Sequence, residues 1–287
     1  MKKIIKTVIC IAALVSAFSC RNNTKPLLPN VSGKAGEVIV VIGKDNWEGN
    51  LGNEIGSLLA RDCEYLPQRE PLYSLVNLSP AAFTDMFKLH RNIVIFNIDS
   101  TVTKQGVVYR TDVWAHPQCV IQVNASCADS AVVVLDRNGE NITGAIEQAE
   151  RNRVIANTLL YEESKLADVV DNMIGGKVHF PVGYTLKKAT DDFIWIADEK
   201  QYTTQGIFIY KYPATDEEPF SEENIIARRN AFLKKYVPGM LDNTYMTTSV
   251  FVKPGIKFLK YHDLDFVETK GLWEVYNDFM GGPFVSH

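Results

Sequence analysis

Apolar and polar residues alternate along the chain with the periods of strands and of helices. Residues 36–43, GEVIVVIG, form a continuous β-branched run, the pattern of a strand buried on both faces. Residues 50–61 follow a polar loop and carry apolar residues at helical spacing, with Asn50 suited to cap the helix. The first part of the chain holds further strand-like runs at residues 72–78, 91–99, 106–115 and 119–125.

A long helix is predicted to separate this part of the chain from a second one. Residues 141–174 lack proline and carry apolar residues at helical spacing up to Gly175, where a helix would end. The length of the segment favours a kink or a break. The second part again alternates strand-like runs with a helix, which Ser221 would cap. We expect an α+β fold with mixed or antiparallel sheets, helices on one face of each sheet, and the long helix joining two halves.

A weak internal sequence similarity raises the question whether the two halves arose by duplication. IVIFNIDSTVTKQGVVYRTDVWA begins at Ile93 and FIWIADEKQYTTQGIFIYKYPA begins at Phe193, and both contain a Thr-x-Gln-Gly turn. One interpretation is that the hairpins around Gly106 and Gly206 are equivalent elements of two similar halves. The other is that two generic hairpins agree by chance.

The N-terminus has the three-part layout of a secretory signal peptide. Lys2, Lys3 and Lys6 give a positive start, and the mostly apolar run from Ile4 to Val15 is too short for a membrane span of about 20 residues. Residues 17–20, Ala-Phe-Ser-Cys, resemble a bacterial lipobox, which implies cleavage before Cys20 and attachment of a diacylglycerol to its sulfur. The alternative is ordinary cleavage without lipid.

The pattern therefore divides the chain into five segments. They are a signal peptide at 1–19, a lipidated tether at 20–36, a first α+β half at 37–140, a connecting helix at 141–176 and a second α+β half at 177–287.

Lipid and charge narrow the range of partners. Several acyl chains would hold the mature chain on a membrane, whereas a single myristoyl chain binds only marginally. Removal of residues 1–19, which hold three lysines and no acid, takes the formal net charge from −4 to −7. An acidic chain without a basic block is a poor nucleic-acid binder. We expect a membrane partner, reached through the lipid anchor, and no nucleic acid.

No familiar catalytic, metal or cofactor motif is present in the sequence. There is no Gly-x-Ser-x-Gly nucleophile elbow, no histidine pair at metal-binding spacing and no phosphate loop, so no catalytic residue, metal or cofactor is predicted. Cys63, Cys119 and Cys127 remain in the mature chain beside Cys20. Cys119 and Cys127 would form a disulfide only if the chain turned back between them, and the alternative is three buried thiols.

The loop GKDNWEG, residues 43–49, is a first candidate binding site. It follows a buried strand and precedes a helix, where open α/β sheets tend to bind ligands. Trp47 would stack on a sugar ring, with Asp45 and Asn46 as hydrogen-bonding partners. The alternative is that Trp47 packs back onto the following helix.

Residues 67–71, PQREP, are a second candidate binding site. Two prolines would stiffen Gln68, Arg69 and Glu70 and reduce the entropy that is lost when a partner binds. The alternative is a tight turn with a solvated ion pair.

Seven stretches together carry a family resemblance: GEVIVVI, LPQREP, HRNIVIFNI, DDFIWIAD, QGIFIYKYP, YVPGMLDNTYMTT and GLWEVYNDFMGGPFVS. In this order they resemble a family of envelope lipoproteins of the Bacteroidota, known as domain of unknown function 4837, over nearly the whole mature chain. The resemblance implies a cell-envelope location and supplies no catalytic residue. It also implies a further strand and helix beyond Phe284.

The residues after Cys20 indicate whether the protein faces the periplasm or the cell surface. Surface-exported lipoproteins of this bacterial group resemble one another in carrying acidic residues just after the lipidated cysteine. Residues 21–25, Arg-Asn-Asn-Thr-Lys, carry two positive charges and no acid. We therefore expect the protein to face the periplasm.

Two segments resemble the short sequon for O-glycosylation in Bacteroidota, an aspartate followed by a hydroxyl residue and a small or apolar residue. They are Asp129-Ser130-Ala131 and Asp99-Ser100-Thr101. Ser130 and Ser100 are therefore candidate glycosylation sites. The alternative for Ser130 is that it caps a helix and carries no sugar.

Two classes of function fit these observations. The first is a non-catalytic binding or assembly module of the envelope, with a protein or glycan partner. The second is an envelope enzyme acting on glycan or peptide, with a site assembled from residues distant in sequence.

Overall fold

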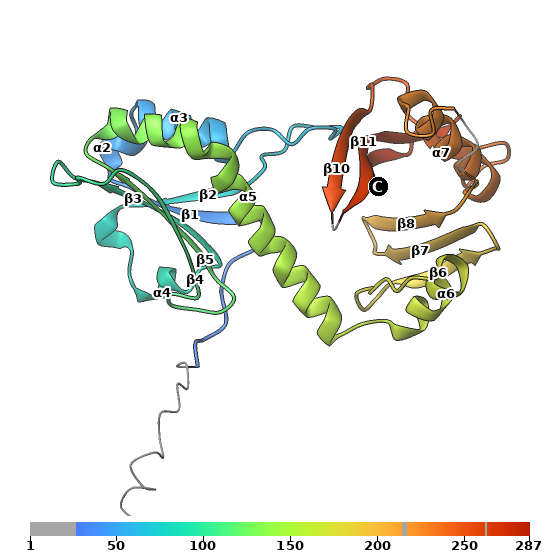
Figure 1. Cartoon of the computed structure of the whole chain (residues 1–287), viewed down its shortest axis with the longest axis horizontal. Coiled ribbons are helices and arrows are strands. Elements are labelled where there is room, and N and C mark those ends of the chain that lie inside the picture. The colour runs from blue at the N-terminus through green and yellow to red at the C-terminus, as the bar shows by residue number, and fades with distance from the viewer. Residues whose placement is uncertain (1–26, 214–216, 262) are drawn as a thin grey trace, which may run out of the picture.

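The computed structural model describes residues 27–213, 217–261 and 263–287, so Cys20 and the predicted signal peptide lie outside the described residues. The described chain forms two halves joined by one long helix, α5 (Ala128–Leu160). Figure 1 shows the first half on the left and the second on the right, with α5 running from one to the other. No helix in these ranges is both long and apolar enough to cross a bilayer.

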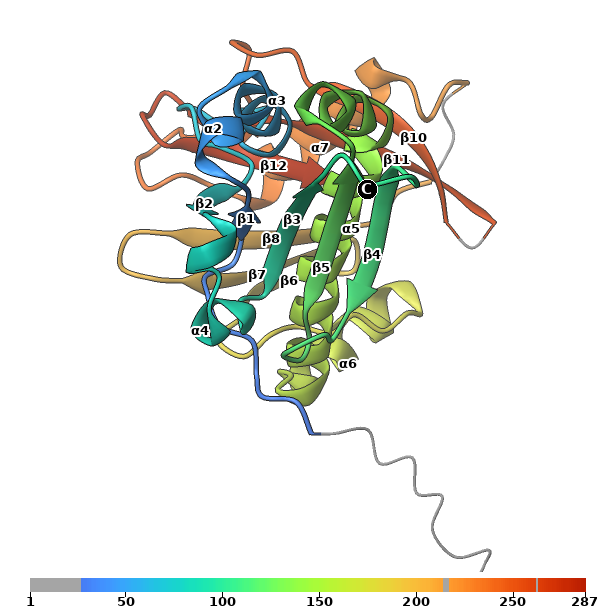
Figure 2. The same cartoon turned by 90° about the vertical axis from the view of Figure 1, so that its left-hand side faces the viewer.

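The first half is built on a five-stranded sheet with the strand order β2-β1-β3-β5-β4. The first four strands are parallel, and β4 closes one edge antiparallel to β5. Figure 2 shows the strands side by side in this order. They are β1 (Glu37–Val41), β2 (Ser74–Leu78), β3 (Asn92–Ile98), β4 (Gly106–Thr111) and β5 (Cys119–Ala125).

The strand predicted within residues 36–43 lies inside this sheet and is buried on both faces. Val38 and Val40 belong to a core that includes α3 and α5. Ile39 and Val41 lie in a second core, which Phe87 of α4 helps to cover. The second face is thus covered too, although only by short elements. The helices beside this sheet are α2 (Lys44–Trp47), α3 (Asn50–Leu59), the 3-10 helix η1 (Pro80–Ala82) and α4 (Asp85–Lys88).

The connecting helix begins earlier than predicted. α5 starts at Ala128 rather than at residue 141, because its first turns carry the buried residues Ala131 and Leu135 against the sheet. Gly139 does not interrupt it. A Cβ at Gly139 would lie 2.9 Å from Cδ1 of Leu58, so the absence of a side chain lets α3 approach α5 closely.

The expected break in the long helical segment is present. α5 ends at Leu160, and α6 (Ser164–Ile174) follows after three residues. Gly175 ends α6 with a φ of +69°, the left-handed conformation that favours glycine at a helix C-terminus. α6 packs on the sheet of the second half and not on that of the first.

The described part of the predicted tether is hydrogen-bonded to the first half. The backbone N–H of His116 donates to the carbonyl of Pro29 at 2.8 Å, and that of Ser32 donates to the carbonyl of Leu89 at 2.8 Å. The N–H of Arg91 in turn donates to Ser32. From Pro29 onward the segment is therefore part of the first half, because its backbone bonds to the loops that precede β3 and β5.

The second half contains two antiparallel sheets with α7 (Glu222–Tyr236) between them. Asn230 on α7 accepts hydrogen bonds from Thr248 of one sheet, and Leu233 packs on Phe193 of the other. Ser221 caps α7 as predicted, since its hydroxyl accepts a hydrogen bond from the N–H of Asn224. The first sheet is β6 (Thr185–Ala189), β7 (Phe193–Glu199) and β8 (Thr204–Tyr210). The second is β9 (Tyr245–Thr248), β10 (Gly255–Tyr261), β11 (Leu264–Tyr276) and β12 (Gly281–Ser286).

The fold class is α+β, with one mixed and two antiparallel sheets in the described residues, and this prediction is confirmed. The prediction of two similar halves is wrong. Around Gly206, β7 and β8 pair directly as a hairpin. Around Gly106, β3 and β4 do not pair, because β5 lies between them and is parallel to β3. The shared turn sequence is therefore a coincidence.

A loop of the first half also reaches the second half. Residues 60–73 connect α3 to β2, and Figure 1 shows this loop extending toward β10 and β11. A Cβ at Gly255 of β10 would lie 2.2 Å from the Tyr65 hydroxyl oxygen, so glycine is needed for this close approach. The halves are thus joined by α5 and also contact each other at this loop.

Candidate functional site

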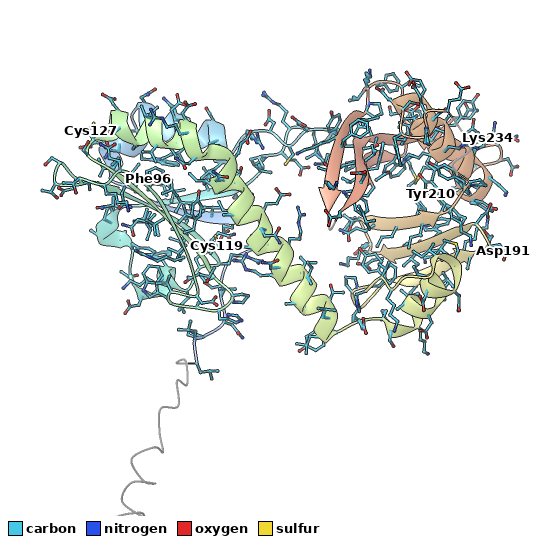
Figure 3. The ribbon with its side chains drawn as sticks, viewed as in Figure 1. Phe96, Cys119, Cys127, Asp191, Tyr210 and Lys234 are labelled. Carbon is cyan, nitrogen blue, oxygen red and sulfur yellow. The ribbon has the colours of Figure 1, made fainter. Side chains whose placement is uncertain are left out.

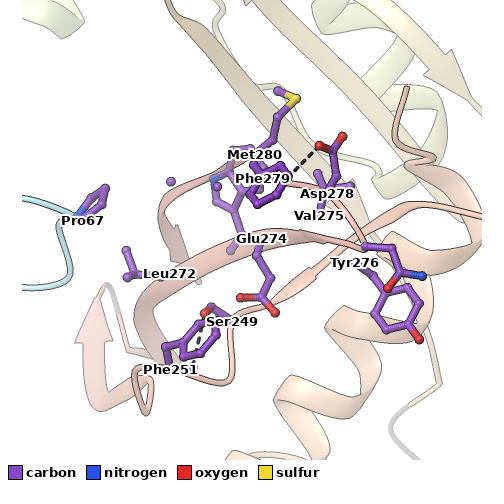
Figure 4. Close-up of a pocket in the computed structure, with 14 residues that line it drawn as sticks. Pro67, Ser249, Phe251, Leu272, Glu274, Val275, Tyr276, Asp278, Phe279 and Met280 are labelled. Atoms are coloured by element: carbon purple, nitrogen blue, oxygen red, sulfur yellow. Dashed lines mark hydrogen bonds between the residues drawn. The ribbon is translucent and has the colours of Figure 1, made fainter. Parts of the chain in front are cut away.

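A groove of about 640 Å³ lies at the contact between this loop and the second half. Pro67 comes from the loop, and all other lining residues come from β11, β12 and the segments beside them. Figure 4 shows Pro67 approaching from a separate segment on one side of the groove. The lining residues are Pro67, Ser249, Phe251, residues 272–280, Gly281 and Gly282.

The turn between β11 and β12 shapes one end of the groove. Asn277 adopts a φ of +61°, and the N–H of Val275 donates to the carbonyl of Met280 at 2.8 Å. Gly282 then lets the Trp273 indole lie against the neighbouring strand, since a Cβ there would be 3.1 Å from Trp273 Nε1. Tight packing at the turn fixes the position of the side chains that border the groove.

Exposed apolar side chains border the groove. The Phe251 side chain is 86% exposed, and that of Phe279 is fully exposed. In Figure 4, Ser249 and Phe251 lie on one side and Phe279 and Met280 on the other. Exposed aromatic residues that gather at a concave site are typical of a surface that binds a partner.

The charged residues that line the groove are all acidic. Glu274 and Asp278 line it, and no lining residue is a lysine, arginine or histidine. Figure 4 shows the Glu274 carboxylate pointing toward Ser249 and Phe251. Carboxylates beside aromatic faces favour a cationic group, through charge attraction and cation–π contact.

The strand next to the groove has an open edge. Among the described residues β12 pairs only with β11, so its outer edge presents backbone groups without a strand partner. Such an edge can accept an added strand from another chain.

A second polar cluster lies between the sheet of the first half and α5. Glu150 of α5 accepts hydrogen bonds from Asn92 at 2.7 Å and from the N–H of Gly36 at 3.3 Å, and forms ion pairs with Arg91 and Arg153. Burial opposes ionisation of Glu150, but these donors outweigh it and the pKa of Glu150 is lowered. The cluster ties α5 to the amino ends of the strands.

His90 belongs to the same cluster. Its Nε2 lies 2.6 Å from a carboxylate oxygen of Glu37, an arrangement that general bases also use. Gly33 covers the imidazole, however, because a Cβ at that position would lie 2.2 Å from Nε2. The ring is only 7% exposed, so the pair is closed to a substrate and serves to hold residues 29–36 on the sheet.

The first predicted site lies far from the groove. Trp47 packs against the core of the first half, and α3 presses on its backbone, since a Cβ at Gly52 would lie 1.7 Å from the Trp47 carbonyl oxygen. This is the packing alternative for Trp47. Asp45 is exposed and Asn46 is half-buried in the same helical turn, α2.

The second predicted site lies next to the groove. Gln68, Arg69 and Glu70 are exposed and follow directly after Pro67, which lines the groove. Arg69 Nε donates to Asp62 at 2.7 Å, so the solvated ion pair of the alternative interpretation is present within the same loop. The structure brings this loop, and not the loop at Trp47, to the groove.

The candidate glycosylation sites differ in exposure. Ser100 is exposed in the turn after β3. Ser130 lies in the first turn of α5, where its hydroxyl is 3.1 Å from Ser126 Oγ and 2.9 Å from Cys127 Sγ. The cap position of α5 is Cys127, so Ser130 does not cap the helix.

The three cysteines of the described residues, Cys63, Cys119 and Cys127, do not form a disulfide. Cys119 begins β5 and Cys127 follows its end, so they lie at opposite ends of a seven-residue strand, as Figure 3 shows. A strand of this length spans roughly 20 Å, whereas disulfides need Cα atoms within about 7 Å. Cys119 is buried, Cys63 is half-buried and Cys127 is exposed. The prediction of three buried thiols therefore holds for Cys119 alone.

Sequence reasoning missed the groove itself. Phe251, Glu274 and Phe279 drew no attention, because each is an ordinary residue in a strand or a turn. The only signal was the concentration of aromatic and acidic residues in GLWEVYNDFMGGPF, residues 271–284. No group of three or more histidine, cysteine or acidic side chains among the described residues is arranged to hold a metal ion.

Two family models match the chain. Residues 163–287 match the domain of unknown function DUF4837, and residues 31–158 match a second domain of unknown function, DUF8532. The resemblance to DUF4837 is thus confirmed for residues 163–287, which hold all of the groove except Pro67. The stretches GEVIVVI, LPQREP and HRNIVIFNI fall within the other match. No curated protein and no solved structure matches the chain.

Proposed function

Since residues 163–287 belong to the DUF4837 family, we propose that the chain is a lipid-anchored protein of the cell envelope that acts as a non-catalytic binding or assembly module. The groove at Pro67, Phe251, Glu274 and Phe279 is its binding site. The observation that carries the proposal is the coincidence of exposed aromatic side chains, carboxylates and an open strand edge at one concave place.

The partner is an extended polypeptide segment with apolar and positively charged side chains. Its backbone pairs with the open edge of β12, in the way that many domains add a peptide strand to a sheet. Its apolar side chains cover Phe251 and Phe279, and a lysine or arginine meets Glu274 or Asp278. Aromatic anchors of this kind supply most of the affinity in protein interfaces.

Site-specific photocrosslinking in intact cells tests the binding site. A photoreactive phenylalanine analogue at Phe279 is expected to give one discrete crosslinked product. The same analogue at Tyr202, an aromatic residue that is 88% exposed and outside the groove, serves as the matched control. Equal crosslinking from both positions, or none from Phe279, would contradict the proposal.

The chemistry of the partner is tested by removing the charges. Glu274→Gln combined with Asp278→Asn keeps the shape of the groove and removes both carboxylates. We expect the product from position 279 to fall at least tenfold, since two charge contacts to one basic segment are lost. Unchanged crosslinking would mean that the groove does not recognise positive charge.

Two separate experiments test the lipid anchor and the side of the membrane that the protein faces. Cys20→Ala is expected to move the protein from the membrane fraction to the soluble fraction, because Cys20 would carry the lipid. Retention in the membrane would show that lipid is not the anchor. Residues 21–25 support a periplasm-facing protein, so protease added to intact cells should spare it, whereas rapid digestion would place it on the surface.

A further inference from the structure

α5 leaves the first half beside the point where the chain enters it. Arg153 Nε donates to the carbonyl of Pro117 at 2.9 Å, and the N–H of the preceding residue, His116, donates to Pro29. Figures 1 and 2 both show the first described residues and the end of α5 on the same side of the molecule. Pro29 and Arg153, which lies two turns before the end of α5, are thus close together.

Beyond Arg153 the helix carries an unusual number of exposed apolar residues. Val154 is 60% exposed and Leu160 is 70% exposed. We call the whole set the α5 end patch: Val154, Ile155, Leu159, Leu160, Tyr161 and, from the adjoining turn, Val182. Exposed apolar residues are normal singly, but five of them within eight successive residues at the end of one helix indicate a contact surface.

The acidic residues next to the patch pair with neighbouring groups of the second half. Glu162 pairs with His179, and a bridge joins Glu162 to Pro181. Glu163 accepts a hydrogen bond from the N–H of Gly183 at 3.4 Å. These contacts place Val182 beside the end of α5 and leave the apolar side chains at the tip.

Apolar side chains surround the end of the helix instead of forming one stripe. Ile155 and Leu159 share a face at a spacing of four, Val154 and Tyr161 share a neighbouring face at a spacing of seven, and Leu160 points to the other side. A partner helix or a second copy of the chain would need a single stripe. A lipid surface that receives the tip accepts apolar groups on all sides.

The tether confines the tip near the membrane. Eight residues lie between Cys20 and Pro29, and the nine steps along the chain span at most about 30 Å. Seven further residues of helix, from Arg153 to Leu160, extend about 10 Å. A weak apolar contact is sufficient at this range, because the anchor keeps the effective concentration of the patch at the membrane high.

We propose that the α5 end patch inserts into the surface of the bilayer that holds the Cys20 lipid. This inference rests on the proposed lipid anchor. It assigns a second, non-covalent membrane contact to the chain, with Tyr161 at the headgroup level, where tyrosine is favoured. The two contacts together fix the orientation of the protein on the membrane.

Quenching by brominated lipids tests the insertion. The full-length lipoprotein, isolated from its own envelope, is placed in phosphatidylethanolamine and phosphatidylglycerol vesicles with brominated acyl chains. Tyr161→Trp reports on the patch, and Tyr202→Trp is the matched control at an exposed tyrosine in the turn between β7 and β8, outside the patch. After subtraction of the signal of the four native tryptophans, we expect at least twofold stronger quenching at position 161.

The outcomes separate this inference from the anchor. Intact mass first shows whether the protein carries acyl chains. If it does, equal quenching at positions 161 and 202 overturns the insertion but not the proposed lipid anchor. The insertion is also overturned if the tryptophan at position 161 is shielded from water but not quenched, and the protein sediments as a dimer. The patch would then contact a second copy of the chain. Absence of acyl chains from the mature protein overturns both proposals. Leu160→Asp should reduce the quenching at position 161 and leave the anchoring unchanged.

Discussion

The hydroxyl of Tyr73 donates a hydrogen bond to the backbone carbonyl of Thr143, which fixes the start of β2 to the middle of α5 at 3.2 Å. Tyr73 is buried, and burial, with the nearby charges of Glu147 and Glu150, raises its pKa to about 12. The neutral phenol is therefore the form that the fold requires.

Tyr73→Phe should change the response of the protein to alkaline pH. Below pH 10 the tyrosine is neutral in both states, and loss of its hydrogen bond should cost about 1 kcal/mol. Between pH 10 and 12 only the unfolded state loses its proton, so the wild type loses stability as the pH rises. By pH 11 this loss amounts to about 1 kcal/mol, and the variant should then match the wild type. Urea unfolding at pH 8 and pH 11 measures the difference, and a gap that stays constant would count against the assignment.

Glu150→Gln should destabilise the protein by about 3 kcal/mol at neutral pH, because Arg91 and Arg153 would lose their carboxylate partner in a partly buried site. Glu147→Gln is the matched control on the same helix. Its ion pair with Arg151 is exposed, and such pairs contribute less than about 1 kcal/mol.

The stability difference between wild type and Glu150→Gln should also depend on pH. The lowered pKa of Glu150 means that its stabilisation is present above its ordinary range and is lost as the pH falls. The difference between wild type and Glu150→Gln in denaturant unfolding should therefore shrink below about pH 4.5. If it grew instead, Glu150 would not be the ionised centre of the cluster.

Arg229→Met should leave the stability within about 1 kcal/mol of the wild type or raise it. Arg229 is 4% exposed, its guanidinium lies 3.9 Å from the centre of the Phe284 ring, and burial lowers its pKa to about 10. Replacement of such a buried charge by an apolar side chain of similar length is often neutral or stabilising. Arg229→Ala, which leaves a cavity as well, should cost about 2 kcal/mol or more. Thermal unfolding of both variants decides the point, and a large loss for methionine would reveal a need for the charge.

Cys127 should react with thiol reagents far faster than Cys119 in the folded protein. Cys127 is exposed, and the hydrogen bond from Ser130 lowers its pKa, whereas burial raises the pKa of Cys119 to about 11. Iodoacetamide labelling at pH 7, followed by peptide mass analysis, measures both rates. Ser130→Ala should slow the labelling of Cys127 and leave Cys119 unchanged. Equal rates for the two thiols would show that the first half opens around β5.

Local sequence signals predicted those elements whose structure is decided locally. The β-branched run at residues 36–43 became a strand buried on both faces, and Ser221 became the cap of α7. They failed at residues 128–140, where Asn138-Gly139 has the composition of a turn. There the packing of Leu58 against Gly139 outweighs the local preference and the helix continues.

Pairing between distant segments could not be predicted from the sequence alone. The segments around Gly106 and Gly206 share a pattern, but their partners are set by which strands lie alongside, β5 in one case and β7 in the other. The groove has the same origin. Pro67, Phe251 and Glu274 are far apart in sequence, and only the contact between the loop and the second half brings them together.

The contact between Tyr65 and Gly255 places the two sides of the groove on different halves of the protein. One wall of the groove, at Pro67, moves with the first half, while its floor at Leu272 and Glu274 moves with the second. α5 is the covalent axis between the halves, so a small rotation about it changes the distance between wall and floor. An occupant that contacts both wall and floor would therefore favour one angle between the halves.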